Sequence, residues 1–109
     1  PVIKRSNLTI VTGALCKKLV LQHKRVIGVD FITQNSSTLT ARAKQEVILC
    51  AGAFESPKIL MLSGIGSKDE LKKHGITVQH ELEGVGKNLH DHLFYAMSSL
   101  SKVKTNNHY

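Results

Sequence analysis

The chain is organised around the stretch Ala51-Gly-Ala-Phe-Glu-Ser-Pro-Lys-Ile-Leu-Met-Leu-Ser-Gly-Ile-Gly66. Residues 47–50 (Val-Ile-Leu-Cys), immediately before it, form an uninterrupted apolar run, which predicts a strand covered on both faces. Ala51, Gly52 and Ala53 have little or no side chain, so their backbone can approach a ligand or a neighbouring element closely. The sequence therefore predicts a buried strand followed by a close-approach turn.

A short helix is predicted directly after this turn. Ser56 is a good N-cap residue, and Pro57 suits the first helical position, where its missing N–H costs nothing. Gly64 can end the helix in a left-handed conformation. The apolar side of the helix is supplied by Ile59, Leu60 and Leu62.

The spacing of these residues also carries a family resemblance. The pattern Gly52-Ala53-x-x-Ser56-Pro57-x-x-Leu60-Met61-x-Ser63-Gly64-Ile65-Gly66 resembles the second signature of the glucose–methanol–choline (GMC) oxidoreductases. These are flavoenzymes that use FAD to oxidise alcohols. The resemblance implies that the main chain of Ala51, Gly52 and Ala53 lies close to FAD.

Upstream of the signature, the residue pattern predicts a small antiparallel β-meander. Strands rich in β-branched residues are expected at residues 7–12, 14–21, 26–33 and 38–43, with the buried strand at residues 47–50 closing the set. The fold class expected for the chain is α/β. In the light of the resemblance, it is part of an FAD-binding, Rossmann-like domain that carries an antiparallel meander.

A second cofactor contact is implied by weaker motifs. Leu8-Thr9-Ile10-x-Thr12-Gly13-Ala14, followed by Val26-Ile27-Gly28-Val29, is similar to the GMC segment that crosses beneath the adenine of FAD. In that family the backbone at the position of Cys16 hydrogen-bonds the adenine ring. Valine is usual there, but cysteine offers the same N–H and C=O. The alternative is that Cys16 only fills the sheet.

The region after the signature contains a further helix and strand. Ser67 and Glu70 form a potential capping box, so a helix is expected over residues 68–74, with Gly75 ending it. A strand is expected at residues 76–80.

Residues 84–92 (Gly-Val-Gly-Lys-Asn-Leu-His-Asp-His) resemble another GMC motif, with His90 where glutamine is more common. His90-Asp91-His92 could suggest a metal site, but three adjacent residues do not easily converge on one ion. Asp91 and His92 are expected to fix a turn, so no metal is predicted.

Composition narrows the classes of partner. The net charge is +7 in 109 residues, but the basic residues occur in ones and twos, and there is no Trp to build a stacking platform for bases, so no nucleic-acid partner is predicted. No apolar run is long enough for a transmembrane segment. Cys16 and Cys50 match no zinc spacing and are expected to be small buried residues in a reducing compartment, which slightly favours the cytoplasm.

Parts of a GMC enzyme have no counterpart in the sequence. It has no Gly-x-Gly-x-x-Gly phosphate loop, and none of its histidines matches the catalytic histidine of the family, so no catalytic residue is assigned. We expect residues 1–97 to be a partial FAD-binding domain of a choline-like alcohol dehydrogenase or oxidase, and residues 98–109 a frayed or truncated tail. Its expected partners are FAD, a small alcohol and the remaining parts of the GMC fold, and the isolated chain is expected to be inactive. The alternative is a small basic α+β binding module without enzymatic activity.

Overall fold

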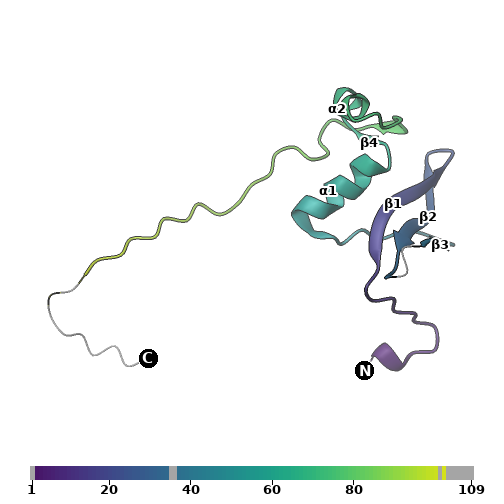
Figure 1. The fold of residues 1–109 in the computed structure, drawn as a ribbon, viewed down its shortest axis with the longest axis horizontal. Coiled ribbons are helices and arrows are strands. Elements are labelled where there is room, and N and C mark those ends of the chain that lie inside the picture. Colours follow the sequence, from purple (N-terminus) through teal and green to yellow (C-terminus); the bar gives the residue numbers. More distant parts are fainter. Residues whose placement is uncertain (1, 35–36, 101, 103–109) are drawn as a thin grey trace.

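A computed structural model describes residues 2–34, 37–100 and 102 of the chain (Figure 1). A three-stranded sheet is followed by two helices. A small two-stranded sheet pairs the segment between these helices with the segment after the second one. In chain order, the elements are η1 (Val2–Lys4), β1 (Leu15–Gln22), β2 (Arg25–Ile32), β3 (Thr38–Arg42), α1 (Gly52–Leu62), β4 (Ile65–Gly66), α2 (Lys68–Lys73) and β5 (His80–Glu81).

The sheet β1-β2-β3 is an antiparallel meander, as the residue pattern predicts. The turn between β1 and β2 places both His23 and Lys24 at positive φ, which is the twist that a two-residue hairpin requires. Gly28 in the central strand has no room for a side chain, because a Cβ there would lie 2.3 Å from the carbonyl oxygen of Ala41 in β3. The three strands expected at residues 14–43 are therefore confirmed.

The strand expected at residues 7–12 is wrong. Residues 8–12 have no regular secondary structure, and Ile10 and Val11 are more than half exposed. Their β-branched side chains favour an extended backbone, but a strand also needs a neighbour to take up its N–H and C=O groups. Within the described residues, no strand pairs with this segment.

The buried strand expected at residues 47–50 is also wrong. This segment has no regular secondary structure and pairs with no strand among the described residues. Ile48 is 75% exposed, and Cys50 is exposed rather than buried. The apolar run identifies residues that favour burial, but the described residues leave Ile48 and Cys50 exposed and cover Val47 and Leu49 only in part. Both cysteines are free, with Cys16 half-buried in β1.

Helix α1 begins earlier than its sequence predicts. It starts at Gly52, so Pro57 lies inside the helix, and Ser56 is not its N-cap. The Ser56 hydroxyl instead accepts a hydrogen bond from the backbone N–H of Ala51, at 3.1 Å. The expected close-approach turn is thus the first turn of a helix. The end of the helix is as predicted, with Gly64 at φ +82°.

The tightest packing lies around the end of α1 and the short helix α2. Leu71 of α2 is fully buried, and Ile59 and Ser63 are each only 5% exposed. Strands β4 and β5 pair in parallel, which places residues on either side of α2 next to each other. The strand expected at 76–80 is wrong except at its last residue, because β5 consists of His80 and Glu81.

Beyond β5 the chain makes a turn and then runs away from the packed part as an extended segment (Figure 1). Leu93, Phe94 and Tyr95 are each more than four-fifths exposed. The turn expected at Asp91 and His92 is absent, since residues 87–100 have no turn or regular structure. The expected tail, residues 98–109, lies largely outside the described residues.

Candidate functional site

The first turn of α1 presents an open stretch of main chain. Ala51, Gly52 and Ala53 are all exposed. Gly52 has φ +85°, and a Cβ added there would meet no atom within 4 Å. The N-cap residue of α1 is Ala51, and no side chain caps the helix there. The first N–H groups of α1 can therefore face a ligand, and they carry the partial positive charge of a helix N-terminus. This geometry suits a polar, anionic ligand that approaches along the backbone.

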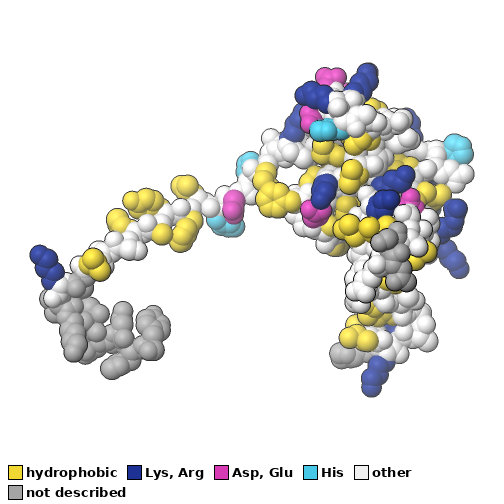
Figure 2. Space-filling model, viewed as in Figure 1, with side chains coloured by type: hydrophobic (Ala, Val, Ile, Leu, Met, Phe, Trp, Pro, Cys, Tyr) yellow, Lys and Arg dark blue, Asp and Glu magenta, His cyan; other side chains and the backbone are white. Residues whose placement is uncertain are grey.

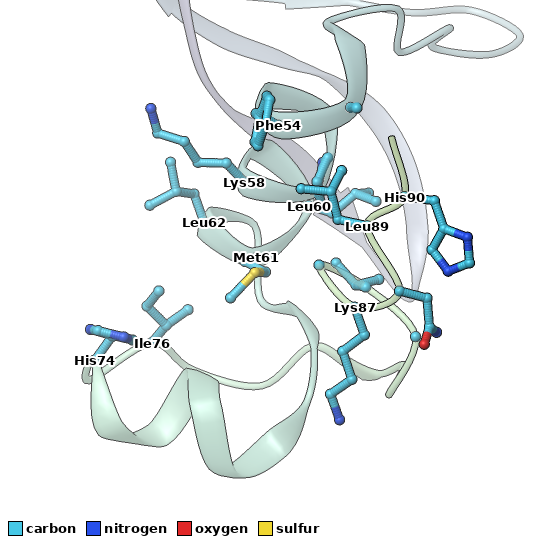
Figure 3. A pocket seen from close by; sticks show the side chains of 16 residues that line it. Phe54, Lys58, Leu60, Met61, Leu62, His74, Ile76, Lys87, Leu89 and His90 are labelled. Atoms are coloured by element: carbon cyan, nitrogen blue, oxygen red, sulfur yellow. The ribbon is translucent and has the colours of Figure 1, made fainter. Parts of the chain in front are cut away.

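A groove of about 940 Å³ begins beside this turn. One wall consists of α1 residues, including Ala53, Phe54 and Met61, and the other consists of residues 84–90. Figure 3 shows the Met61 side chain between Lys87 and His90 on one side and His74 and Ile76 on the other. Figure 2 shows apolar side chains exposed where the extended segment leaves the packed part. The groove therefore has an apolar floor, with cationic and imidazole groups along its rim.

Cys16 lies elsewhere, near the start of β1. This strand is at the edge of the sheet, so the main-chain groups on its outer side are left out of the ladder. The register with β2 shifts by one residue between Cys16 and Lys18, a β-bulge that re-aims the backbone at this position. Burial, and then the nearby Asp30 carboxylate, raise the pKa of the Cys16 thiol, which keeps the side chain neutral. Cys16 does not line the groove, so it and Ala53 do not share a cavity.

Ser63 connects helix α1, which carries Gly52 and Ala53, to strand β1, which carries Cys16. Its buried hydroxyl accepts a hydrogen bond from the backbone N–H of Leu19 in β1, at 2.7 Å. It also donates to the carbonyl of Ile59 one helical turn earlier, at 2.6 Å. The sequence motif includes Ser63, but only the structure shows that it anchors α1 to the edge of the sheet.

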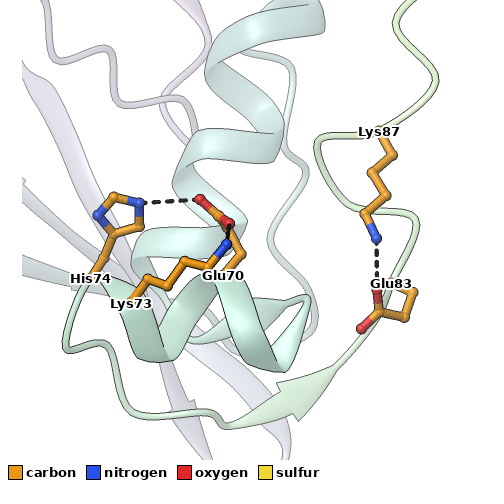
Figure 4. Close-up of polar contacts among 5 residues, drawn as sticks. All are labelled: Glu70, Lys73, His74, Glu83 and Lys87. Atoms are coloured by element: carbon orange, nitrogen blue, oxygen red, sulfur yellow. Dashed lines mark hydrogen bonds and ion pairs between the residues drawn. The ribbon is translucent and has the colours of Figure 1, made fainter.

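The capping box expected at the start of α2 is wrong in its contacts, although the helix is in place. Ser67 is the N-cap, yet its side chain makes no capping hydrogen bond. Glu70 instead turns toward the end of the helix, where its oxygens lie 3.2 Å from Lys73 Nζ and 3.2 Å from His74 Nε2 (Figure 4). Hydrogen bonds from Lys73 and then from His74 lower the pKa of Glu70.

His90, Asp91 and His92 follow the turn after β5, in a segment without regular secondary structure. In the part of the chain that the structure describes, no group of three His, Cys, Asp or Glu side chains is placed to hold a metal ion. Asp91 and His92 are fully exposed, and the Asp91 carboxylate accepts a hydrogen bond only from the neighbouring backbone N–H of His92. Among the described helices, none is long and apolar enough to cross a membrane.

Comparison with known proteins identifies the class. A sequence model of the family described as GMC oxidoreductase matches residues 1–94, so the chain belongs to the GMC oxidoreductase family. It is 52% identical over 89 residues to oxygen-dependent choline dehydrogenase from Pectobacterium atrosepticum, covering 82% of this chain and 16% of that protein. It is 43% identical to patulin synthase from Penicillium expansum, over 91% of this chain and 16% of that protein.

Solved structures show the same fold. An FAD-dependent oxidoreductase from Chaetomium thermophilum superimposes with a TM-score of 0.72 at 38% identity, covering 76% of this chain and 14% of that protein. The mixed α/β architecture with an antiparallel meander is therefore confirmed. The chain spans about one-sixth of the length of the curated relatives that it matches.

Proposed function

We propose that residues 1–97 are part of the FAD-binding domain of a GMC oxidoreductase that oxidises a primary, choline-like alcohol, and that residues 98–109 are a tail outside this domain. The family match over residues 1–94 and the name of the choline dehydrogenase relative support this assignment. The observation that carries it is the open main chain at Gly52, in the middle of the sequence signature.

The residues present fit the cofactor. The exposed backbone of Ala51, Gly52 and Ala53 would contact the nucleotide, and the helix N-terminus there favours an anionic group. Main-chain groups of Cys16, which lies in the edge strand β1, would hold the adenine. FAD supplies the chemistry by accepting a hydride, whereas this chain binds and orients the cofactor.

The exposed apolar surface supports a role within a larger domain. Large apolar side chains remain exposed in the described residues, among them Ile48 at 75% and Phe54 at 72%. The remaining parts of the GMC fold would cover them, which explains why residues 47–50 are apolar but unpaired here.

The catalytic base of the reaction is proposed to lie outside this segment. His23, His74, His80, His90 and His92 are all exposed. A base that takes a proton from an alcohol works within hydrogen-bond reach of it in a site held against the cofactor. His74 and His90 line the groove that Ala53 borders, but both are exposed side chains at its rim. We therefore expect no turnover by the 109-residue chain alone.

The first test is the absorbance spectrum of the protein expressed from the complete gene. A flavin spectrum that is bleached by choline, and less by unrelated alcohols, would support the proposal. A purified, folded protein that neither contains nor takes up FAD would overturn it. A flavin spectrum that choline does not bleach would support FAD as the cofactor and reject choline as the substrate.

The second test addresses the contact residues by substitution. Gly52→Val places a branched side chain against the proposed cofactor position, so it should weaken FAD binding by at least about tenfold. Gly75→Val is the matched control, because Gly75 also has positive φ and open space around it but lies at the end of α2. Equal losses in both variants would show that backbone strain, not cofactor contact, is responsible.

A substitution at Cys16 is expected to have no effect on FAD binding, in contrast to Gly52→Val. Because the proposed adenine contact uses only main-chain groups, Cys16→Val should leave the dissociation constant of FAD unchanged. A large loss of affinity would show that the thiol itself takes part.

A further inference from the structure

Helix α1 lies beside strand β1 (Figure 1), and the hydroxyl of Ser63 at the C-terminal end of the helix joins the two elements. This oxygen accepts a hydrogen bond from the N–H of Leu19 at 2.7 Å and donates its own hydrogen to the carbonyl of Ile59 at 2.6 Å. All three residues are at most 6% exposed, so neither bond is readily exchanged for one with water. The single hydrogen of the hydroxyl is thus committed to α1, and one of its lone pairs to β1.

Side-chain packing between the two elements leaves space beside this bond. A cavity of about 420 Å³ is lined by residues 18–21 of β1 and by Leu62 and Ser63 at the end of α1. Close packing fixes the angle between two elements only where side chains fill the seam. We therefore expect the hydrogen bond, which is directional, to fix how this end of α1 meets β1.

The place of Ser63 gives this bond influence over the other end of the helix. Helix α1 begins at Gly52, and its 11 residues span about 16 Å. A tilt of about 10° around the Ser63 end would therefore move the main chain at Gly52 by about 3 Å. On the other side of the bond, Leu19 follows Cys16 by three residues in the same strand. The bond thus relates the two stretches of main chain that are proposed to contact FAD.

We propose that Ser63 is a positioning residue that sets the separation between the main chain at Cys16 and the main chain at Gly52, so that both contact one FAD molecule. This inference rests on the proposed function for the identity of the ligand and for the two contacts. Ser63 does not line the groove that Ala53 borders, so it acts through the helix rather than by touching the cofactor.

The test measures the affinity of FAD for the apoprotein of the protein expressed from the complete gene. Ser63→Ala removes only the hydroxyl, so the dissociation constant of FAD should rise about three- to tenfold. Thr40→Val is the matched control, because the Thr40 hydroxyl donates to Asp30 at 2.6 Å between β2 and β3, and β3 is not adjacent to β1. An unchanged FAD affinity in Ser63→Ala, or an equal loss in Thr40→Val, would overturn the proposal.

Adenosine separates a change in separation from general damage to the site. It carries the adenine that β1 is proposed to hold, but neither the phosphates nor the flavin. Because Ser63→Ala leaves β1 itself in place, the inhibition constant of adenosine in competition with FAD should stay within about twofold of the natural value. Equal losses of affinity for adenosine and FAD would contradict the proposal.

A conservative variant tests whether the hydroxyl is responsible. Ser63→Thr keeps a hydroxyl that can bond to the carbonyl one turn earlier, and the cavity beside residue 63 has room for the added methyl group. Its FAD affinity should remain within about twofold of the natural value, whereas a loss as large as that in Ser63→Ala would reject the role of the hydroxyl. Ser63→Cys, whose sulfur is a weak acceptor, provides the same comparison if Ser63→Ala does not fold.

The natural apoprotein distinguishes failure of this inference from failure of the proposed function. If it is folded and does not bind FAD, the proposed cofactor is rejected, and this inference with it. If it binds FAD and Ser63→Ala binds FAD equally well, the cofactor stands and only the positioning role is rejected.

Discussion

The hairpin β1-β2 and the apolar run at residues 47–50 have similar β-rich sequences but different structures. In the hairpin, each strand finds its partner a few residues away, across the turn at His23 and Lys24. The run at 47–50 has no partner strand among the described residues and forms no regular secondary structure, with Ile48 75% exposed. The difference shows that strand formation here depends on where the neighbour lies, because backbone groups must be paired as well as apolar side chains buried.

A similar contrast separates the packed junction of α1, β4 and α2 from the extended segment after β5. The junction contains the fully buried Leu71 and the buried Ser63, whereas Leu93 is fully exposed. The comparison predicts that the stability of the 109-residue chain resides in contacts made within it, and that the exposed apolar residues contribute only when other parts of the domain cover them. Four substitutions test this, each by urea unfolding of the 109-residue chain.

The largest effect is expected for Leu71→Ala. Leu71 is 0% exposed, so truncation removes buried methyl groups and leaves a cavity, at a cost of about 2–5 kcal/mol in the free energy of unfolding. Leu93→Ala is the matched control and should change the free energy by less than about 0.5 kcal/mol. Similar values for the two variants would mean that the junction is not the stable part of the chain.

Gly64→Ala should be the next most damaging change. A Cβ at Gly64 would lie 2.4 Å from the carbonyl oxygen of Thr77, so overpacking of about 1–3 kcal/mol adds to a left-handed backbone penalty of about 1 kcal/mol. Gly75→Ala has the same backbone penalty, but the added Cβ has no neighbour within 4 Å. The difference between the two variants therefore measures the overpacking at residue 64. Equal destabilisation by the two substitutions would show that residues 64 and 77 do not approach each other in solution.

Ser63→Ala tests the connection between α1 and the sheet. The variant leaves the N–H of Leu19 without its partner, which should cost about 1–3 kcal/mol and speed amide exchange at Leu19. Ser56→Ala removes a hydroxyl from the exposed start of the same helix and should cost no more than about 1 kcal/mol. Protection of the Leu19 amide that survives Ser63→Ala would argue against this anchor.

The smallest effect is expected for Ile48→Ala, and it depends on context. In the 109-residue chain the side chain is mostly exposed, so the free energy of unfolding should change by less than about 0.5 kcal/mol. In the protein expressed from the complete gene, where we propose that this run is covered, the same substitution should lower the thermal midpoint measurably. No effect in either context would contradict the proposal that other parts of a larger domain cover residues 47–50.

Local chemistry explains which features could be predicted from the sequence. The meander, the left-handed glycines at Gly64 and Gly75 and the helix after Ser67 follow from residue periodicity and from the conformational freedom of glycine. The start of α1 was not predictable in this way, because Ser56 and Pro57 are good helix-start residues even though the helix begins at Gly52. Likewise, the capping box at Ser67 and Glu70 has the right spacing, but lysine and histidine at the end of α2 compete for the carboxylate.

The sequence by itself determined the family, because the spacing of small residues, serine and proline from Gly52 to Gly66 can be recognised without knowing any contact in the structure. It also determined which residues favour strands and turns. Only the tertiary structure decided that Ser63 ties α1 to β1 and that Ala53 borders a groove. These features join residues far apart in the chain, and the spacing of residue types carries no information about which distant groups will meet.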